Sequence, residues 1–223
     1  MVTFFDYFQV ICLALFLFLV IGISIYIRKT EKITAVRLTL KDKGLQGFLE
    51  ISLFVIVNIC IVEVLLYALH TDFHLFPAPL DMPLVRTLSS RITGVLLLTG
   101  GYAIYISALF SLGISWRLGI DEKKPGRLVT TGIYAITRNP MYIFFNLFFL
   151  GTFLINGTLI FLIFTIFAAI NLHYQILGEE KFLEEVHGQL YRDYRSVTGR
   201  YLPWRRVRAF ATRSPLLFNH PQK

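Results

Sequence analysis

The stretch TRNPMY, residues 137–142, combines the start of a helix with side chains that can bind a charged ligand. Asn139 suits a helix N-cap, and Pro140 suits the first helical position, where its missing N–H costs nothing. The start of a helix also offers free backbone N–H groups and a partial positive charge, which favour a carboxylate or a phosphate. Arg138 adds a guanidinium, and Tyr142 adds an aromatic hydroxyl. The stretch therefore predicts a helix start that can also serve as an anion site.

Two adjacent carboxylates, Glu179 and Glu180, follow the two apolar runs that come after TRNPMY. If these runs form a hairpin, each arm rises roughly 25–30 Å at about 1.5 Å per residue, which returns the carboxylates to the level of residues 137–142. Carboxylates accept hydrogen bonds from an ammonium group or from ribose hydroxyls. Together the two segments predict a site for a zwitterion such as an amino-acid-like ligand. A structural alternative is that Arg138 pairs with Glu179 or Glu180 and that Tyr142 is an interfacial anchor.

The composition predicts that these segments belong to an integral membrane protein. The chain has 223 residues, of which 55% are hydrophobic and 16% charged, and its mean hydropathy is +0.62. Soluble domains carry about 25% charged residues. No linker or repeat divides the sequence, so residues 1–223 are expected to form a single all-α membrane domain. A net charge of +8 would suggest nucleic acid for a soluble protein. In this chain the basic residues follow a membrane topology instead, and no nucleic-acid partner is expected.

Five apolar segments approach the roughly 20 residues that a membrane-spanning helix needs. They cover about 5–27, 48–69, 92–112, 140–156 and 158–176, and the turn signal Asn156–Gly157 separates the last two. The segments outside the spans carry 0, 6, 2, 5, 0 and 9 Lys and Arg residues in chain order. By the positive-inside rule this alternation places the N-terminus outside, and it places the C-terminus and TRNPMY in the cytoplasm.

The segment that follows the fifth span predicts a cytoplasmic amphipathic helix, which lies against the membrane interface or against the bundle. Its apolar residues recur at helical spacing: Phe182, Leu183, Val186, Leu190, Tyr194 and Val197. Farther along the chain, a basic stretch contains Arg205, Arg206, Arg208 and Arg213. These residues suit either attraction to anionic membrane lipids or a simple positive-inside anchor.

The run LVTTGIYAITRNPMYIFF, followed after a hairpin by EEKFLEEVHGQLYRDYRSVTGRYLP, resembles the isoprenylcysteine carboxyl methyltransferase family and its bacterial relatives. It is also similar to the related membrane phospholipid N-methyltransferases. The family pattern reads LVTxGxYxxxRHPxY, then a hydrophobic hairpin, EE and FGxxYxxY. The resemblance covers about residues 111–204, in the same order and spacing, whereas residues 1–110 match only as hydrophobic spans.

The resemblance implies a membrane methyltransferase that binds S-adenosylmethionine at the cytoplasmic ends of its last helices, without a Rossmann domain. The residues expected to line the cofactor site are Arg127, Leu128, Val129, Tyr134, Arg138, Asn139, Pro140, Met141, Tyr142, Glu179 and Glu180. In this interpretation a glutamate takes the ammonium group or a hydroxyl. The backbone N–H groups at the helix start take the carboxylate together with Arg138. Tyrosine faces cover the adenine or the sulfonium, the latter by cation–π attraction.

Two departures from the family pattern concern the site. Asn139 replaces the usual His after Arg, and it keeps a capping and hydrogen-bonding group. Gln175 stands where the eukaryotic enzymes carry an Arg that is thought to meet the substrate carboxylate. A neutral amide binds a carboxylate less well than an Arg fork does, so Gln175 is a candidate for altered substrate recognition. His173 is the nearest candidate base on the substrate side, although a hydrogen-bonded interior His is the favoured explanation.

The sequence therefore predicts methyl transfer to a lipophilic or small membrane-permeant acceptor, which is a prenylcysteine-like carboxylate, a lipid amine or a small thiol. Two other functions stay open. A steroid-reductase-like enzyme would bind NADPH through the basic residues Lys123, Lys124 and Arg127, and a non-catalytic scaffold would keep only the fold.

Several polar residues remain outside this prediction. Glu63 is an intramembrane carboxylate, a functional candidate by default, but its place near the outer side favours a structural hydrogen bond to a neighbouring span. His70, Asp72 and His74 lie in a Pro-rich outer loop without a further ligand cluster, so no metal site is expected there. Asn146 and Asn171 are expected either to bond to each other across the last hairpin or to line an acceptor tunnel.

Overall fold

The computed structural model describes residues 3–31, 44–113 and 128–201. Six α-helices account for most of these residues, and within them no strand forms apart from two isolated β-bridges. The helices are α1 (Phe4–Glu31), α2 (Gly44–Ala68), α3 (Leu88–Leu112), α4 (Pro140–Asn156), α5 (Leu159–His187) and α6 (Gln189–Val197). Two short 3-10 helices, η1 (Ala78–Asp81) and η3 (Gly132–Ala135), lie in the connections. The predicted all-α fold is confirmed.

Four of the helices are long and apolar enough to cross a membrane: Phe4–Tyr26 of α1, and α2, α3 and α5. The fifth predicted span, α4, is helical as expected but has 17 residues, so it is the shortest of the apolar helices. Large apolar side chains point outward from these helices, among them Phe18, Leu96 and Phe110, which is 85% exposed. An apolar surface on helices whose backbone bonds are internal is what a bilayer requires. The chain is therefore an all-α membrane protein.

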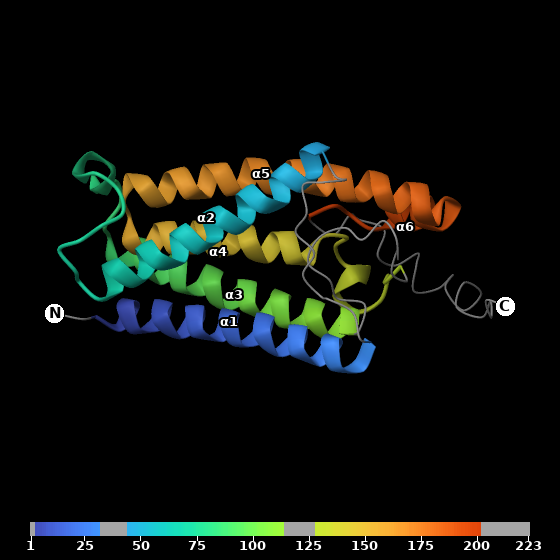
Figure 1. Ribbon diagram of the computed structural model, residues 1–223, viewed down its shortest axis with the longest axis horizontal. Coiled ribbons are helices and arrows are strands. Elements are labelled where there is room, and N and C mark those ends of the chain that lie inside the picture. The colour runs from blue at the N-terminus through green and yellow to red at the C-terminus, as the bar shows by residue number, and fades with distance from the viewer. Residues whose placement is uncertain (1–2, 32–43, 114–127, 202–223) are drawn as a thin grey trace.

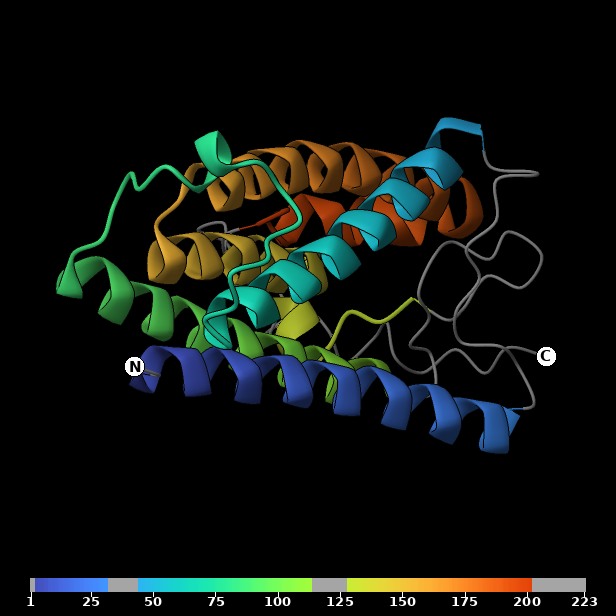
Figure 2. The ribbon, with the colours of Figure 1, turned by 60° about the vertical axis from the view of Figure 1, so that its left-hand side comes forward.

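The long helices form one elongated bundle in which α1, α3, α4 and α5 run side by side and α2 crosses them obliquely (Figures 1 and 2). Helices α3 and α4 approach most closely where two glycines face each other. A Cβ atom on Gly94 would lie 2.6 Å from the carbonyl oxygen of Gly151, and one on Gly151 would lie 2.9 Å from that of Gly94. Small residues of this kind permit the close backbone approach that is typical of membrane helices.

The turn between α4 and α5 is the hairpin that the Asn156–Gly157 signal predicts. Gly157 adopts the left-handed conformation (φ 68°), in which side chains are strained, and its N–H caps α4 at Phe153. The carbonyl of Gly157 accepts hydrogen bonds from Leu84 and Val85 of the long loop between α2 and α3. The hairpin turn and this loop therefore hold each other at the end of the bundle opposite α6 (Figure 1).

A separate amphipathic helix was expected to begin near residue 178, and this predicted starting point is wrong. Helix α5 continues through Gly178 to His187, and the chain breaks only at Gly188, where φ is 52°. Gly178 stays helical because it is needed for contact rather than for a turn: a Cβ atom there would collide with the side chain of Gln46 on α2. Only α6 then forms the short amphipathic tail, and it buries Tyr191 and Tyr194.

We expect Gly151→Leu to destabilise the bundle, because the new side chain meets Gly94 and Leu98 at backbone distance. Overpacking of this kind costs about 1–3 kcal/mol, which lowers the thermal unfolding midpoint of the detergent-solubilised protein. Gly100→Leu is the matched control on α3, because nothing lies within 4 Å of a Cβ atom at that position. Equal midpoints for the two variants would contradict close glycine packing between α3 and α4.

Candidate functional site

The predicted site lies at the end of the bundle where α4 begins, α5 ends and α6 packs (Figure 1). The segment that follows α6 returns to the start of α4 and pairs with it as a single parallel bridge between Thr137 and Gly199. The N–H of Arg138 donates to the carbonyl of Gly199 at 3.0 Å, and the hydroxyl of Thr137 donates to the carbonyl of Arg200 at 3.0 Å. Residues 198–201 therefore complete this end of the bundle.

The carboxylate of Glu180 is the centre of the hydrogen bonds at this end. Arg138 donates to it through Nη2 at 2.9 Å and through Nε at 3.3 Å, and Arg200 donates through Nη2 at 2.8 Å and through Nε at 3.1 Å. The amide of Asn139 donates to the same carboxylate at 3.3 Å. The remaining Arg138 donor, Nη1, binds the carbonyls of Arg195 and Thr198. The predicted pairing of Arg138 with one of the two glutamates is therefore present, and its partner is Glu180.

Burial makes this ion pair necessary to the local structure. The side chains of Arg138 and Glu180 are 8% and 6% exposed, and that of Arg200 is 30% exposed. A buried charge without a partner is costly, so each guanidinium needs the carboxylate and the carboxylate needs at least one of them. The hydrogen bonds between Arg200 and Glu180 raise the pKa of Arg200, so the Arg200 guanidinium stays charged.

Asn139 occupies the N-cap position but does not cap the helix with its side chain. The structure contains no side-chain cap bond at this position, and the amide nitrogen of Asn139 donates instead to Glu180 and to the carbonyl of Arg200. The expected cap bond is therefore wrong. Within the described chain, the N–H groups of Met141 and Tyr142 donate to no protein acceptor, whereas that of Ile143 bonds to the carbonyl of Asn139. The free donors of the helix start are thus available to a ligand.

Glu179 has surroundings quite different from those of its neighbour Glu180. Its carboxylate accepts a hydrogen bond from the hydroxyl of Tyr142 at 2.7 Å. Within the described residues that is the one hydrogen bond its side chain accepts. Glu50 of α2 is buried and near enough to interact electrostatically with both Glu179 and Tyr142. Glu50 was absent from the predicted site, although a carboxylate at the edge of an apolar run is a signal for function.

The other predicted cofactor residues lie on the segment that leads into α4. Tyr134, in η3, accepts a hydrogen bond on its carbonyl from the hydroxyl of Tyr194 at 2.6 Å. Burial raises the pKa of both tyrosines, so their hydroxyls are neutral at physiological pH. Leu128 and Val129 are half-buried and precede η3. Arg127, like Lys123 and Lys124, lies outside the described residues.

A groove of about 730 Å³ runs between α4 and α5 on the outside of the bundle. Its lining is mostly apolar, with polar groups from four residues, and consists of Ile143, Asn146, Leu147, Ala169, Ile170, His173, Tyr174 and Tyr201. It begins at Ile143, one residue beyond Tyr142. His173 forms a hydrogen bond with the hydroxyl of Tyr201 at 2.8 Å. His173 is exposed on the outside of the bundle, so the expectation of an interior histidine is wrong.

Gln175 does not line the groove and is separated from His173, its predicted neighbour on the substrate side. Two residues along a helix turn the side chain by about 200°, and Gln175 points at α2, where its amide donates to the carbonyl of Leu49 at 3.1 Å. Asn171 shares that face and donates to Ser52 at 2.7 Å. Asn146 instead donates to the carbonyl of Tyr142 and lines the groove. The expected bond between Asn146 and Asn171 is therefore wrong.

We expect Glu180→Gln to release residues 198–201 from the start of α4, because two guanidiniums lose their counter-charge. Removal of one partner from a buried ion pair costs about 3–5 kcal/mol. The measurements are the thermal unfolding midpoint and the rate at which trypsin cleaves after Arg200. Glu184→Gln is the matched control, because its ion pairs with Arg192 and Arg195 are exposed and are worth about 0–1 kcal/mol. A Glu180 variant as stable as the control would contradict this role.

Comparison with known proteins agrees with this geometry. Residues 89–190 match the model of the phospholipid methyltransferase family, a segment that covers nearly all of α3, the whole of α4 and α5, and the first two residues of α6. No curated protein sequence matches the chain significantly. The matched segment contains TRNPMY, both glutamates, and every groove residue except Tyr201. Residues 89–190, which carry most of the candidate site, are therefore similar to the phospholipid methyltransferase family of membrane methyltransferases.

Proposed function

We propose that the protein is an S-adenosylmethionine-dependent methyltransferase that methylates a lipophilic acceptor at the cytoplasmic face of a membrane. Membrane location and methyltransferase family follow from the helices and the family match. The cofactor, the acceptor and the cytoplasmic orientation are the proposal. The orientation rests on the distribution of Lys and Arg, which is densest between the first and second spans, between the third and fourth spans, and after the fifth span.

The observation that carries the proposal is the difference in hydrogen bonding between the two adjacent glutamates. Glu180 is fully engaged with Arg138, Arg200 and Asn139, whereas Glu179 keeps carboxylate capacity beyond its bond from Tyr142. A partly buried carboxylate of this kind favours a cationic or hydroxyl-bearing ligand, because such a ligand supplies the missing donors. We therefore assign Glu179 to the ligand. Arg138 and Glu180 become positioning residues rather than cofactor contacts.

The residues around Glu179 suit the other parts of S-adenosylmethionine. The free N–H groups of Met141 and Tyr142, at the positive end of α4, suit the carboxylate of the methionine moiety. Glu179 suits its ammonium group or a ribose hydroxyl. The aromatic faces of Tyr134 and Tyr142 suit the adenine or the sulfonium. Pro140 adds no donor, but it starts the helix at this point, and Leu128 and Val129 provide apolar contact.

Methyl transfer is an in-line displacement at carbon, so the chain mainly has to align the acceptor and exclude water. When bound, S-adenosylmethionine supplies the activated methyl group. A carboxylate or thiolate acceptor needs no base at neutral pH, whereas an ammonium acceptor first has to lose a proton. For such an acceptor, His173 is the nearest candidate, since it lies in the groove and bonds to Tyr201.

The groove between α4 and α5 supports a lipophilic acceptor over a small thiol. Its wall is apolar along Ile143, Leu147, Ala169 and Ile170, and it lies on the surface that faces lipid. An acceptor dissolved in the bilayer can therefore enter sideways and place its polar end near Tyr142. Gln175 is turned toward α2 and leaves no guanidinium fork for a substrate carboxylate. Lipid amines and prenylated or acylated acceptors thus remain the favoured classes.

Calorimetry tests the cofactor assignment through S-adenosylhomocysteine, the demethylated product of the cofactor. We expect the detergent-purified wild type to bind it and Glu179→Gln to lose at least about tenfold in affinity, because one charge-assisted hydrogen bond contributes about 1.5–3 kcal/mol. Glu185→Gln is the matched control on an exposed face of α5. Absence of binding by a folded wild type would exclude the proposed cofactor. A thermal-shift comparison with NADPH separates this function from a reductase.

Substitution of Ala169 tests the acceptor groove separately. Ala169 is exposed and lines the groove, so Ala169→Trp fills it without touching Glu179. We expect transfer of radiolabelled methyl groups to a membrane lipid extract to fall at least about tenfold, because the acceptor can no longer align with the methyl group. The affinity for S-adenosylhomocysteine should stay unchanged, because the groove does not bind the cofactor. Ala103→Trp, on the exposed side of α3, should leave both quantities unchanged. Unchanged methylation in the Ala169 variant would exclude entry through this groove.

A further inference from the structure

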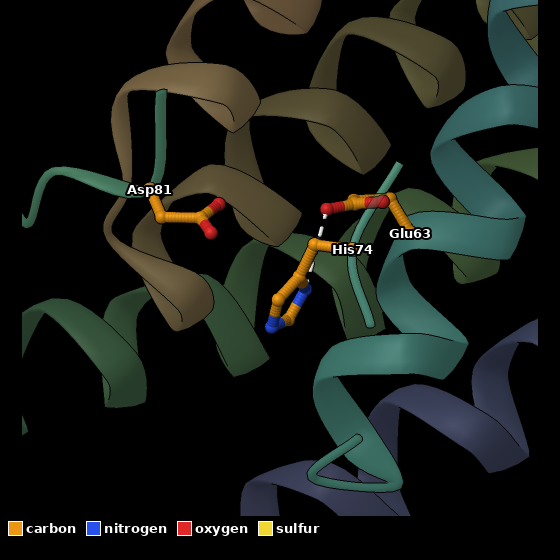
Figure 3. A group of neighbouring side chains, drawn as sticks. All are labelled: Glu63, His74 and Asp81. Carbon is orange, nitrogen blue, oxygen red and sulfur yellow. Dashed lines mark ion pairs between the residues drawn. The ribbon is translucent and has the colours of Figure 1, made fainter. Parts of the chain in front are cut away.

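We propose that Glu63, His74 and Asp81 bind a divalent transition-metal ion, with Zn²⁺ as the best match. The three residues come from α2, from the loop that follows it and from η1, at the end of the bundle opposite the candidate methyl-transfer site (Figures 1 and 3). They are distinct from the loop residues His70, Asp72 and His74, at which no metal site was expected, and His74 alone is common to the two groups. Glu63 was expected to bond to a neighbouring span.

The geometry brings one ligand atom from each side chain to one place. These atoms lie within 4.8 Å of one another, and His74 Nδ1 is 3.6 Å from Glu63 Oε1. Ligand atoms about 2.0–2.2 Å from a tetrahedral Zn²⁺ lie roughly 3.4 Å apart. The pair formed by Glu63 and His74 already has this spacing. The separations of up to 4.8 Å exceed this spacing by at most about 1.4 Å, so small movements of the loop residues bring the whole set to coordination distance.

Each carboxylate already has one oxygen bound by the protein. Oε2 of Glu63 accepts from the N–H of Leu75 at 3.1 Å, and Oδ1 of Asp81 accepts from the hydroxyl of Tyr67. The ring of Tyr67 also packs edge-on against His74, with ring centroids 4.8 Å apart. Supporting groups that fix the direction of ligand side chains are typical of metal sites. Tyr67 and Leu75 would perform that task here.

Two buried atoms without hydrogen-bond partners provide a second, independent observation in favour of a metal ion. Glu63 is 0% exposed, yet its Oε1 has no hydrogen-bond partner, and neither does Nδ1 of His74. Figure 3 shows the two groups pointing toward each other. Buried polar atoms without partners are rare in native proteins, because each costs the full penalty of its desolvation. A cation between them satisfies both atoms.

A metal ion also balances the charge better than the alternative, which is an ion pair between Glu63 and protonated His74. Two carboxylates carry two negative charges, and one imidazolium neutralises only one of them. A divalent cation with neutral His74 neutralises both. Mixed imidazole and carboxylate ligands favour Zn²⁺ and similar ions over Mg²⁺ or Ca²⁺, which prefer oxygen alone.

Binding at this position would fasten the loop between α2 and α3 to the bundle. The same loop holds the α4–α5 turn through Gly157, and Tyr67 lies 3.4 Å from the hydroxyl of Thr158 in that turn. One ion would thus connect α2, the loop and the hairpin. A structural role of this kind is independent of the methyltransferase chemistry.

The test uses the full chain without a polyhistidine tag, because such a tag binds zinc itself. We expect protein stripped with a chelator and dialysed against ZnCl₂ to retain stoichiometric zinc by mass spectrometry of the metal. We also expect ZnCl₂ to raise the thermal unfolding midpoint, and MgCl₂ or CaCl₂ to leave it unchanged. Competition with a chromogenic chelator then measures the affinity.

Two variants of ligand residues and one variant of Tyr67, which supports Asp81, sharpen the test. Glu63→Gln and Asp81→Asn remove charge but keep size, and Asp81→Asn lies in the accessible loop, where misfolding is least expected. Both should abolish stoichiometric zinc, and Tyr67→Phe should weaken binding about 10–100-fold. His70→Gln is the matched control, because His70 is a nearby loop histidine that pairs with Asp6 instead.

Gel filtration and circular dichroism establish that each variant is folded. Zinc retained equally by wild type and Asp81→Asn would overturn the site, as would equal loss in His70→Gln. A wild type whose zinc content and unfolding midpoint do not respond to ZnCl₂ would leave the ion pair between Glu63 and His74 as the explanation. A response to Mg²⁺ or Ca²⁺ in place of Zn²⁺ would overturn the assignment to a transition metal.

Discussion

The buried carboxylate of Glu180 is the constraint on which the candidate site depends. It is shared by Arg138 at the start of α4 and by Arg200 after α6, so one charge joins segments that lie 20 and 42 residues away from it in the chain. Because a buried charge cannot be left unpaired, the start of α4, the end of α5 and the C-terminal segment have to remain together. Asn139 is drawn into the same cluster, which leaves backbone donors of α4 free.

This arrangement gives two neighbouring glutamates opposite roles. Successive residues on a helix point about 100° apart, so Glu180 faces the arginines while Glu179 faces Tyr142 and the side of α2 that carries Glu50. Two such steps, about 200°, separate His173, which lines the groove, from Gln175, which faces α2. The cofactor side and the acceptor side of the proposed enzyme are thus different faces of the same helix pair.

Much of the fold was predictable because its signals are local. Apolar runs located the first five helices, and Asn156–Gly157 located the hairpin turn, since a left-handed residue there favours glycine. The site was predictable in part: a hairpin of known rise had to return Glu179 and Glu180 to Arg138. The end of α5 was not predictable from a Gly at 178, because that glycine serves contact with Gln46, which lies 132 residues earlier in the chain.

By itself, the sequence determined a helical membrane protein with a signature hairpin and the set of residues that meet at one end of it. Only the tertiary structure decided which glutamate is engaged, which face His173 occupies, and that Glu63, His74 and Asp81 converge at the other end. The physical reason is the separation along the chain of the residues that interact. Helix formation and turns depend on neighbours within a few residues, whereas the partner of a buried charge is set by packing between segments far apart in the chain.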